Sequence, residues 1–183
     1  SLDGGANTSL PGCGNSSLGS LSGGAHTVSV YANDSFGNTG SATRQFSVDS
    51  TAPSVAIQSP SNSSYATTSV QLNFTATDSN GISRCWYSLN GGANQTLAGC
   101  ANTSITASQG ANSVRAYAND TLGNLNSAIQ YFSVDSSAPA VAIISPGNST
   151  YGTGSIALSY TASDSTLSSC WYSLDGGANQ TLA

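Results

Sequence analysis

The amino-acid sequence predicts an all-β fold composed of tandem β-sandwiches, each with seven short strands. Stretches in which apolar and polar residues alternate indicate half-buried strands, and turns rich in Gly, Asn and Pro separate them. The same pattern returns after about 86 residues, which indicates structural repeats. No segment has the 3.6-residue apolar period of a helix. Many short strands in so small a unit are typical of a two-sheet sandwich.

Four sequence motifs show the repeat directly. They are YAND at residues 31–34 and 117–120, FSVDS at 46–50 and 132–136, AP at 52–53 and 138–139, and CWYSL at 85–89 and 170–174. The first three return after 86 residues and the fourth after 85. These offsets predict that residues 1–49 are the C-terminal part of one repeat, residues 50–136 a complete repeat, and residues 137–183 the N-terminal part of the next.

The chain begins and ends at the same point of its repeat, because SLDGGAN occupies residues 1–7 and again residues 173–179. Both ends fall within a predicted hairpin, where domain boundaries are unusual. We therefore expect the 183 residues to be a window of about two periods from a longer array. The alternative is a subunit whose incomplete ends are completed by neighbouring copies, as in strand-donation assemblies.

Each strand of the complete repeat has its own sequence signal. The predicted strands are residues 54–57, 70–76, 85–89, 95–98, 104–107, 113–118 and 128–134. The first ends before Pro60, which cannot continue a strand ladder. In the second, Val70, Leu72 and Phe74 alternate with polar residues. The Asn-Gly-Gly turn at residues 90–92 predicts a hairpin between the third and fourth strands.

The sixth predicted strand repeats a face that is already present one repeat earlier. Val114, Ala116 and Ala118 share one side of it, as Val28, Val30 and Ala32 do one repeat earlier. A unit of this size buries only a modest core and gains from covalent reinforcement.

Composition and charge exclude several classes of partner. Only 6% of the residues are charged, the formal net charge is -5, and the three cations are Arg44, Arg84 and Arg115. Nucleic-acid binding requires a basic stripe that neutralises phosphates, and three arginines cannot form one. No apolar run approaches the roughly 18 residues of a membrane span. We therefore expect neither a nucleic-acid partner nor a membrane span in this segment.

The sequence resembles the immunoglobulin-like (fibronectin type III-like) repeats of prokaryotic, especially archaeal, cell-surface and extracellular filament proteins. The resemblance covers the whole chain through its repeats. It is carried by WYSLNGGA at residues 86–93, YANDTLGN at residues 117–124 and the linker FSVDSSAP at residues 132–139. It implies an immunoglobulin-like fold and a place in stalks, fibres, surface layers or adhesins. These motifs imply nothing about catalysis.

Catalytic residues are not expected. The single histidine, His26, lies beside a turn, and its counterpart one repeat later is Asn112. A Ser-His-Asp triad needs a base in each active unit, so we expect His26 to be a solvated loop residue. The chain contains no Glu. We therefore predict that the protein is not an enzyme.

We expect no metal site and no cofactor, with one alternative at the domain junctions. Asp49 and Asp135 lie in the linkers, and Asp78 and Asp164 follow the second strand of their repeats. Such carboxylates can bind Ca²⁺, which takes six to eight oxygen ligands. The spacing of an EF-hand is absent. Asp120 and its counterpart Asp34 are explained by Asx turns without any ligand.

The four cysteines indicate an oxidising compartment. Cys85 and Cys100 flank the predicted hairpin, so antiparallel pairing brings them together in a disulfide. Closing a 15-residue separation stabilises the fold by about 3 kcal/mol in the chain-entropy model. Cys13 occupies the repeat position of Cys100, and Cys170 occupies that of Cys85. We expect both to pair with residues outside this window. The alternative is that Cys13 and Cys170 pair between subunits.

N-glycosylation is the strongest functional signal in the sequence. Of sixteen Asn residues, ten stand in Asn-x-Ser/Thr sequons: Asn7, Asn15, Asn33, Asn62, Asn73, Asn94, Asn102, Asn119, Asn148 and Asn179. Chance in a chain of this composition gives roughly five. The alternative is that loops rich in Ser and Thr form sequons by accident. Glycans would keep a weakly charged surface soluble and protect exposed strand edges.

Trp86 and Trp171 have two possible positions. If Tyr87 and Leu89 face the core, alternation places Trp86 on the outer face, where it stacks on a sugar or packs against a neighbour. The alternative is the core tryptophan of an immunoglobulin-like sandwich.

Two functions remain. The first is a structural, N-glycosylated protein, located extracellularly or on the cell surface, that forms a fibre, stalk or surface-layer-like assembly with copies of itself. The second is an adhesin or carbohydrate-binding module. The similarity of adjacent repeats favours the first, because a binding tip usually differs from its stalk.

Overall fold

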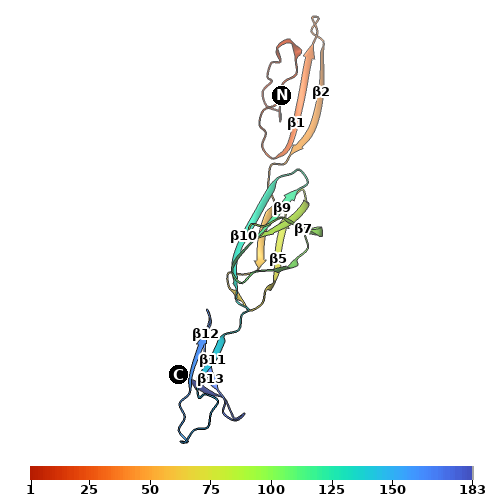
Figure 1. Cartoon of the computed structure of the whole chain (residues 1–183). Coiled ribbons are helices and arrows are strands. Elements are labelled where there is room, and N and C mark those ends of the chain that lie inside the picture. Colours follow the sequence, from red (N-terminus) through yellow and green to blue (C-terminus); the bar gives the residue numbers. More distant parts are fainter. Residues whose placement is uncertain (183) are drawn as a thin grey trace.

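The computed structural model describes residues 1–182, and its strands form three parts arranged end to end (Figure 1). The N-terminal part contains β1 (Gly24–Asn33) and β2 (Thr39–Val48). The middle unit contains β3 to β10, and the C-terminal part contains β11 to β14. Two short 3-10 turns, Pro11–Cys13 and Ala98–Cys100, are the only helical elements among these residues. No helix in the described chain is long and apolar enough to cross a membrane.

The middle unit is a sandwich of two sheets. Its strands are β3 (Ser54–Ser59), β4 (Ser64–Tyr65), β5 (Ser69–Thr77), β6 (Ile82–Leu89), β7 (Gln95–Leu97), β8 (Thr103–Thr106), β9 (Gly110–Asp120) and β10 (Leu125–Val134). One sheet has the order β4-β10-β9-β6-β7, and the other has the order β3-β5-β8. The predicted all-β sandwich fold is therefore confirmed.

The core of the middle unit lies between these two sheets. Val70 and Leu72 of β5 are 2% and 0% exposed, and Val114, Ala116 and Ala118 of β9 are all 0% exposed. Each set alternates along its strand, so the side chains of one sheet face those of the other. Burying an aliphatic side chain of this size stabilises the fold by about 1.5–3 kcal/mol.

The structure contains one strand that the sequence pattern did not predict. β4 has two residues, too few for an alternating pattern, and it pairs with the end of β10 in the parallel direction. Tyr65 of β4 packs edge-on against Phe132, with 5.9 Å between the ring centroids. Most of the predicted strands are longer in the structure, by up to three residues at an end, while the predicted strand 95–98 ends one residue earlier, where a 3-10 turn begins.

The two outer parts contain smaller sheets. β1 and β2 pair over their whole length, from Gly24↔Val48 to Asn33↔Thr39. In the C-terminal part, β11 (Ala140–Ser145) pairs with β12 (Ser159–Ser163), and β13 (Cys170–Tyr172) pairs with β14 (Gln180–Leu182). Most of the large apolar side chains that are exposed belong to these outer parts, although Leu122, Leu125, Ile129 and Tyr131 of the middle unit are exposed as well.

Candidate functional site

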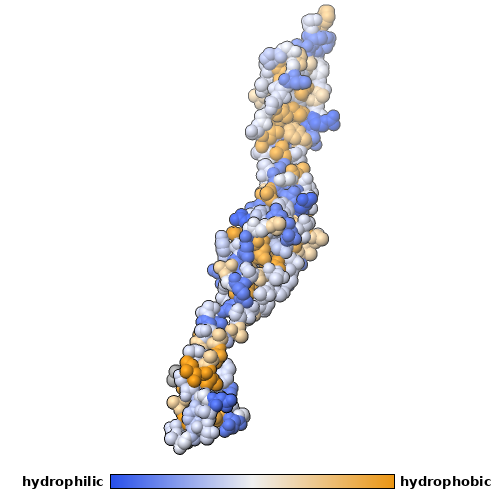
Figure 2. Space-filling model, in the orientation of Figure 1, coloured by the Kyte–Doolittle hydropathy of each residue, from blue (hydrophilic) through white to orange (hydrophobic). Residues whose placement is uncertain are grey.

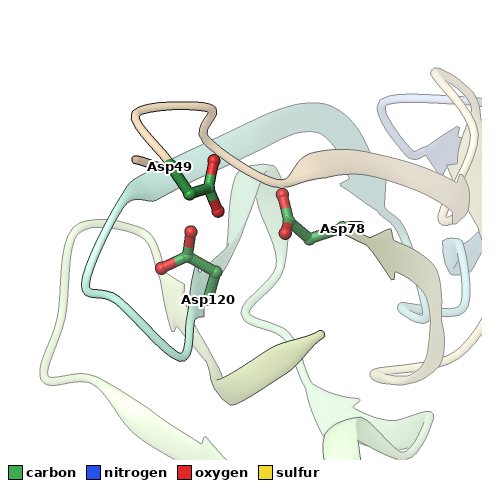
Figure 3. Close-up of side chains that lie close together, drawn as sticks. All are labelled: Asp49, Asp78 and Asp120. Carbon is green, nitrogen blue, oxygen red and sulfur yellow. The ribbon is translucent and has the colours of Figure 1, made fainter. Parts of the chain in front are cut away.

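Three aspartates converge at the junction between the N-terminal part and the middle unit (Figure 3). Asp49 follows β2, Asp78 follows β5, and Asp120 ends β9. One carboxylate oxygen from each lies within 4.8 Å of the others. The junction therefore concentrates three of the eight acidic side chains of the chain.

Asp120 is placed in this cluster by the alternation of β9. Since Val114, Ala116 and Ala118 point into the core, Asp120 points the same way and is only 1% exposed. Its Oδ1 accepts hydrogen bonds from the backbone N–H groups of Leu122 (2.9 Å) and Asn124 (2.8 Å). The Asn124 side-chain amide donates a third bond to Oδ2 at 2.8 Å.

These hydrogen bonds keep Asp120 ionised. Burial is the largest influence on this carboxyl and acts to raise its pKa, but the bonds from Asn124 and Leu122 outweigh burial, so the pKa lies below its ordinary value. The sequence interpretation of an Asx turn accounts for these bonds. It missed the approach of Asp120 to Asp49 and Asp78, which the inward position of residue 120 in the β9 alternation would have indicated.

Asn80 joins the other two aspartates. Its backbone N–H donates to Asp78 Oδ1 at 2.8 Å, and its side-chain amide donates to Asp49 Oδ2 at 2.6 Å. The Thr121 hydroxyl donates to the Asn80 carbonyl at 3.1 Å. The linker is thus held to two loops of the middle unit.

The second junction repeats this arrangement with different side chains. Thr166, the counterpart of Asn80, donates its backbone N–H to Asp164 Oδ1 and its hydroxyl to Asp135 Oδ2, both at 2.8 Å. The Ser165 hydroxyl also donates to Asp135 Oδ2, at 3.0 Å. The hydroxyls of Thr166 and then Ser165 lower the pKa of Asp135. A hydrogen-bonded bridge between linker and sandwich is therefore common to both junctions.

The cluster of Asp49, Asp78 and Asp120 has some properties of a cation site and lacks others. No Lys or Arg forms an ion pair with these carboxylates in residues 1–182. Asp49 also lines an open hollow of about 370 Å³ at the junction. However, each carboxylate already accepts hydrogen bonds, and three carboxylates supply fewer than the six to eight oxygens that Ca²⁺ takes. The junctional Ca²⁺ stays a prediction.

The hairpin cysteines form a disulfide. Cys85 of β6 and Cys100, at the end of the second 3-10 turn, are joined with a Cα–Cα distance of 5.1 Å. The Cys85 side chain lies in the core, and β6 pairs with β7 from Cys85↔Leu97 to Tyr87↔Gln95. Cys13 and Cys170 are free thiols in this structure, the first exposed and the second half-buried.

Trp86 lies on the outer face of the five-stranded sheet. Its neighbours in sequence, Cys85 and Tyr87, contact the core, and its own ring stacks on Tyr117 with 5.4 Å between centroids and an interplanar angle of 8°. The core alternative for Trp86 is therefore wrong. Trp171 is 59% exposed. A role of either tryptophan in an interface or in sugar stacking stays a prediction.

His26 is not a solvated loop residue, so that expectation is wrong. It lies in β1, is 7% exposed, and contacts the Phe46 ring. Its Nδ1 lies 2.8 Å from Asp3 Oδ2, and its Nε2 lies 2.8 Å from the Ser22 carbonyl oxygen. Both partners are acceptors, so both bonds form only when the imidazole is protonated. The Ser22 carbonyl and then Asp3 accordingly raise the pKa of His26.

The sequence counterpart of this pair is found in the middle unit as two asparagines. Asn112 is 4% exposed, and its Oδ1 accepts a hydrogen bond from the Asn90 side chain at 2.9 Å. Asp3 Oδ1 accepts from the Thr27 backbone N–H, as Asn90 Oδ1 accepts from the Ser113 N–H, both at 2.7 Å. His26 thus has a structural partner, and the pair fastens a hairpin turn to the neighbouring strand.

Eight of the ten sequon asparagines have exposed side chains, namely Asn7, Asn15, Asn33, Asn62, Asn94, Asn102, Asn148 and Asn179. Asn73 and Asn119 are half-buried. The Asn119 amide oxygen is buried without a hydrogen-bond partner in the described chain. Glycan attachment at all ten stays a prediction.

A family of known proteins matches part of the middle unit. The family described as "Bacterial Ig domain" matches residues 53–116, which lie within the middle unit. The middle unit has an immunoglobulin-like fold. Among solved structures, the fibronectin(III)-like modules of Clostridium thermocellum CbhA are 20% identical, with 62% of this chain covered and a TM-score of 0.41. The match spans 64% of that chain, just under two thirds. No curated protein matches the sequence.

Proposed function

We propose that this chain is a structural, N-glycosylated extracellular protein whose immunoglobulin-like units form a fibre, a stalk or a surface-layer-like assembly. The observation that carries the proposal is the hydrogen bonding at the junction between the N-terminal part and the middle unit. Three parts follow one another end to end (Figure 1). The Asn80 side chain of the middle unit donates a hydrogen bond to Asp49 in the linker that precedes this unit. Such hydrogen bonds restrict the linker, which would lack them if it were flexible.

The linker between β2 and β3 is bonded at three points. Asn80 bonds the Asp49 side chain, Asn124 donates to the Asp49 carbonyl at 3.2 Å, and Asn126 donates to the Pro53 carbonyl at 2.8 Å. Pro53 is fully buried, and its ring restricts the backbone further. These contacts favour a stiff connection, which suits a structural rod.

The surface supports the extracellular part of the proposal. It carries few charges, and Figure 2 shows pale, weakly polar residues over much of the visible face. Glycans on the exposed sequons would add the hydration that charged side chains supply in other proteins. The Cys85–Cys100 disulfide fits an oxidising compartment. The archaeal source implied by the sequence resemblance also stays a proposal.

An adhesin or carbohydrate-binding module is the second candidate. The Trp86–Tyr117 stack favours it, because an aromatic platform on the outer face of a sheet offers an apolar surface to a sugar ring. The Trp86→Ala variant would abolish sugar binding on a glycan array if this candidate holds. It would leave the assembly of a purely structural protein intact.

Intact glycopeptide mass spectrometry on the native protein tests the first proposal. We expect glycans on most of the eight exposed sequon asparagines and lower occupancy at the half-buried Asn73 and Asn119. Unmodified asparagine at all ten positions would overturn the glycosylated surface.

A further inference from the structure

The outer face of the five-stranded sheet in the middle unit differs from the same face one repeat earlier. Residues of β9 and β10 that alternate with the core side chains point outward, away from the smaller sheet. At four of these positions the middle unit has larger apolar or charged residues: Arg115 for Ser29, Leu125 for Thr39, Ile129 for Thr43 and Tyr131 for Gln45. The core side of the same strands is retained, as in Phe46 and Phe132. The fold therefore does not require the outer residues of the middle unit.

Two of the three cations of the chain lie on this face. Arg84 of β6 and Arg115 of β9 are exposed, and each is next in sequence to a core residue, Cys85 or Ala116. Within residues 1–182, neither arginine forms an ion pair with a carboxylate. The aspartates of residues 49–135 lie at the two junctions. In a chain with a formal net charge of -5, this face is therefore a local concentration of positive charge.

The two arginines bracket the stacked pair of Trp86 and Tyr117. Trp86 lies opposite Tyr117 in the register of β6 and β9, whereas Arg84 lies opposite Asn119 and Arg115 lies opposite Ser88. The levels of the two arginines are thus separated by about 13 Å along the strands. A linear ligand of that length can contact both guanidinium groups and the aromatic rings between them.

Each ring of the aromatic pair has one face that the other ring does not cover. The rings are nearly parallel, at 8°, with 5.4 Å between centroids, so each covers one face of the other. On its far side Trp86 has Thr96 of β7 as its neighbour. Tyr117 has Ser127 of β10, and both neighbours are small and polar. Arg115 Nη1 donates a hydrogen bond to Ser127 Oγ at 3.4 Å, which places the guanidinium on the open side of Tyr117.

We propose that this face of the middle unit binds a carboxylate-bearing polysaccharide of the surroundings, whose uronic acid rings stack on Trp86 and Tyr117 and whose carboxylates bind Arg84 and Arg115. A guanidinium group holds a carboxylate through two parallel N–H···O bonds. The C–H groups of a sugar ring pack against the aromatic faces. The inference goes beyond the structural role. It rests on the second candidate of the proposed function and names its ligand class.

An acidic peptide is the competing ligand, and the position of the face disfavours it. An extended peptide binds a sheet by adding a strand at an edge. The sheet has the order β4-β10-β9-β6-β7, so β6 and β9 lie inside it, each between two neighbouring strands. A saccharide needs no free backbone groups of the protein, because ring faces and side-chain donors hold it. The two arginines favour an acidic saccharide over a neutral one.

Calorimetric titration of the 183-residue chain tests the proposal. The probes are a galacturonate tetrasaccharide and a hyaluronan tetrasaccharide, their methyl esters, which keep the sugar rings and lose the charge, and a tetra-aspartate peptide. We expect at least one acid to bind, and its methyl ester to bind roughly tenfold or more weakly, because charge-assisted hydrogen bonds are lost. Equal binding of acid and ester would overturn the acidic ligand class and leave a neutral sugar site. Binding of neither acid, or tighter binding of the peptide, would overturn the inference.

Variants that copy the neighbouring repeats separate binding from folding. Arg84→Ser and Arg115→Ser introduce the residues that Ser169 and Ser29 supply at the same repeat positions. Each variant should weaken binding of the acid roughly tenfold. The matched control is Arg44→Gln, which removes the third arginine and introduces the residue of its counterpart in the middle unit. It should leave the dissociation constant unchanged, and equal losses in all three variants would overturn the site.

The two tryptophan side chains report where the ligand binds. In heteronuclear NMR spectra the indole N–H signal of Trp86 should shift with added acid, whereas that of Trp171, which follows Ser169 and Cys170 instead of an arginine and a cysteine, should not. The Trp171→Phe variant assigns the two signals. Equal shifts of both would overturn the site. Full glycan occupancy at Asn119, opposite Arg84, would also overturn it, because the glycan would cover the face.

The failure of this inference is distinguishable from the failure of the structural proposal. Regular native fibres beside a chain that binds neither acid would overturn the saccharide site alone. Binding of the acid by native protein that forms no fibres and carries no glycans would overturn the structural proposal and support the saccharide site.

Discussion

The middle unit and the C-terminal part have nearly the same sequence pattern but bury it differently. Leu72 and Leu158 occupy the same repeat position, yet Leu72 is 0% exposed and Leu158 is 39% exposed. Val70 and Ile156 differ in the same way, at 2% and 41%. The difference shows that local alternation determines which side of a strand is apolar. Burial of that side requires β9 and β10, which lie roughly forty or more residues further along the chain.

The largest effect on stability is expected when the two equivalent leucines, Leu72 and Leu158, are each replaced by alanine. Leu72→Ala leaves a cavity in the closed core and should lower the free energy of unfolding of the middle unit by about 4 kcal/mol. Leu158→Ala should lower the free energy of unfolding of the C-terminal part by less than about 0.5 kcal/mol. Urea denaturation followed by tryptophan fluorescence measures both. Equal losses in the two variants would show that the C-terminal part already has a closed core.

The next largest difference in stability is expected between variants that lack the bonded cysteines and variants that lack the free ones. Replacing Cys85 and Cys100 together by Ser removes a cross-link over a separation of 15 residues and should cost about 3 kcal/mol of stability in the chain-entropy model. Replacing Cys13 and Cys170 together should leave the middle unit unchanged, because neither is bonded within one copy. Thermal denaturation of the two double variants measures the difference. A comparable drop in both would contradict the assignment of Cys85–Cys100 as the stabilising bond.

The contact between His26 and Asp3 and its counterpart between Asn112 and Asn90 are expected to differ in the pH dependence of their stability. The raised pKa of His26 means that its contribution is complete below the ordinary value of 6.5 and is lost as the pH rises through the higher folded value. The pKa of Asp3 is lowered, first by the His26 hydrogen bond, so its contribution is complete above 3.8 and is lost as the pH falls through the lower folded value. The contact is therefore strongest between 3.8 and 6.5.

Amide exchange, corrected for intrinsic rates, measures this contrast. Protection of the Thr27 amide should fall above pH 6.5, whereas protection of the Ser113 amide, bonded to Asn90, should stay constant. The double variant Asp3→Asn, His26→Asn reproduces the asparagine pair of the middle unit and should remove the pH dependence. A flat profile for Thr27 in the unmodified protein would contradict the protonated state of His26.

The Ca²⁺ alternative predicts the smallest effect. Extracellular sites bind Ca²⁺ with dissociation constants near 1 mM, so 10 mM Ca²⁺ should stabilise the middle unit by about 1.4 kcal/mol and raise its Tm by roughly 6–11 °C. Asp78→Asn removes one carboxylate of the cluster and should abolish the rise, whereas Asp175→Asn, outside the cluster, should keep it. An unchanged Tm would leave the aspartates as hydrogen-bond acceptors alone.

The sequence was sufficient to predict the fold because its signals are local. Alternation in β5 and β9 and the Asn-Gly-Gly turn each depend on a few adjacent residues, and they gave the strands and the pairing of Cys85 with Cys100. The two-residue strand β4 has no such pattern.

Contacts across long separations could not be predicted in the same way. His26 is hydrogen-bonded to Asp3, which lies 23 residues away in sequence, and Asp49 lies close to Asp120 across the junction. Such contacts depend on the assembled sandwich. Only the alternation of β9, which directs residue 120 inward, gave a local indication of one of them.

Cryo-electron microscopy of the native protein tests the central claim most directly, namely that its immunoglobulin-like units assemble into a regular extracellular structure. The account predicts long fibres or layers in which sandwich-sized domains follow one another through straight junctions, with additional density for glycans at the exposed sequon asparagines. Isolated chains bent freely at residues 49–53, without regular assembly and without glycan density, would contradict it.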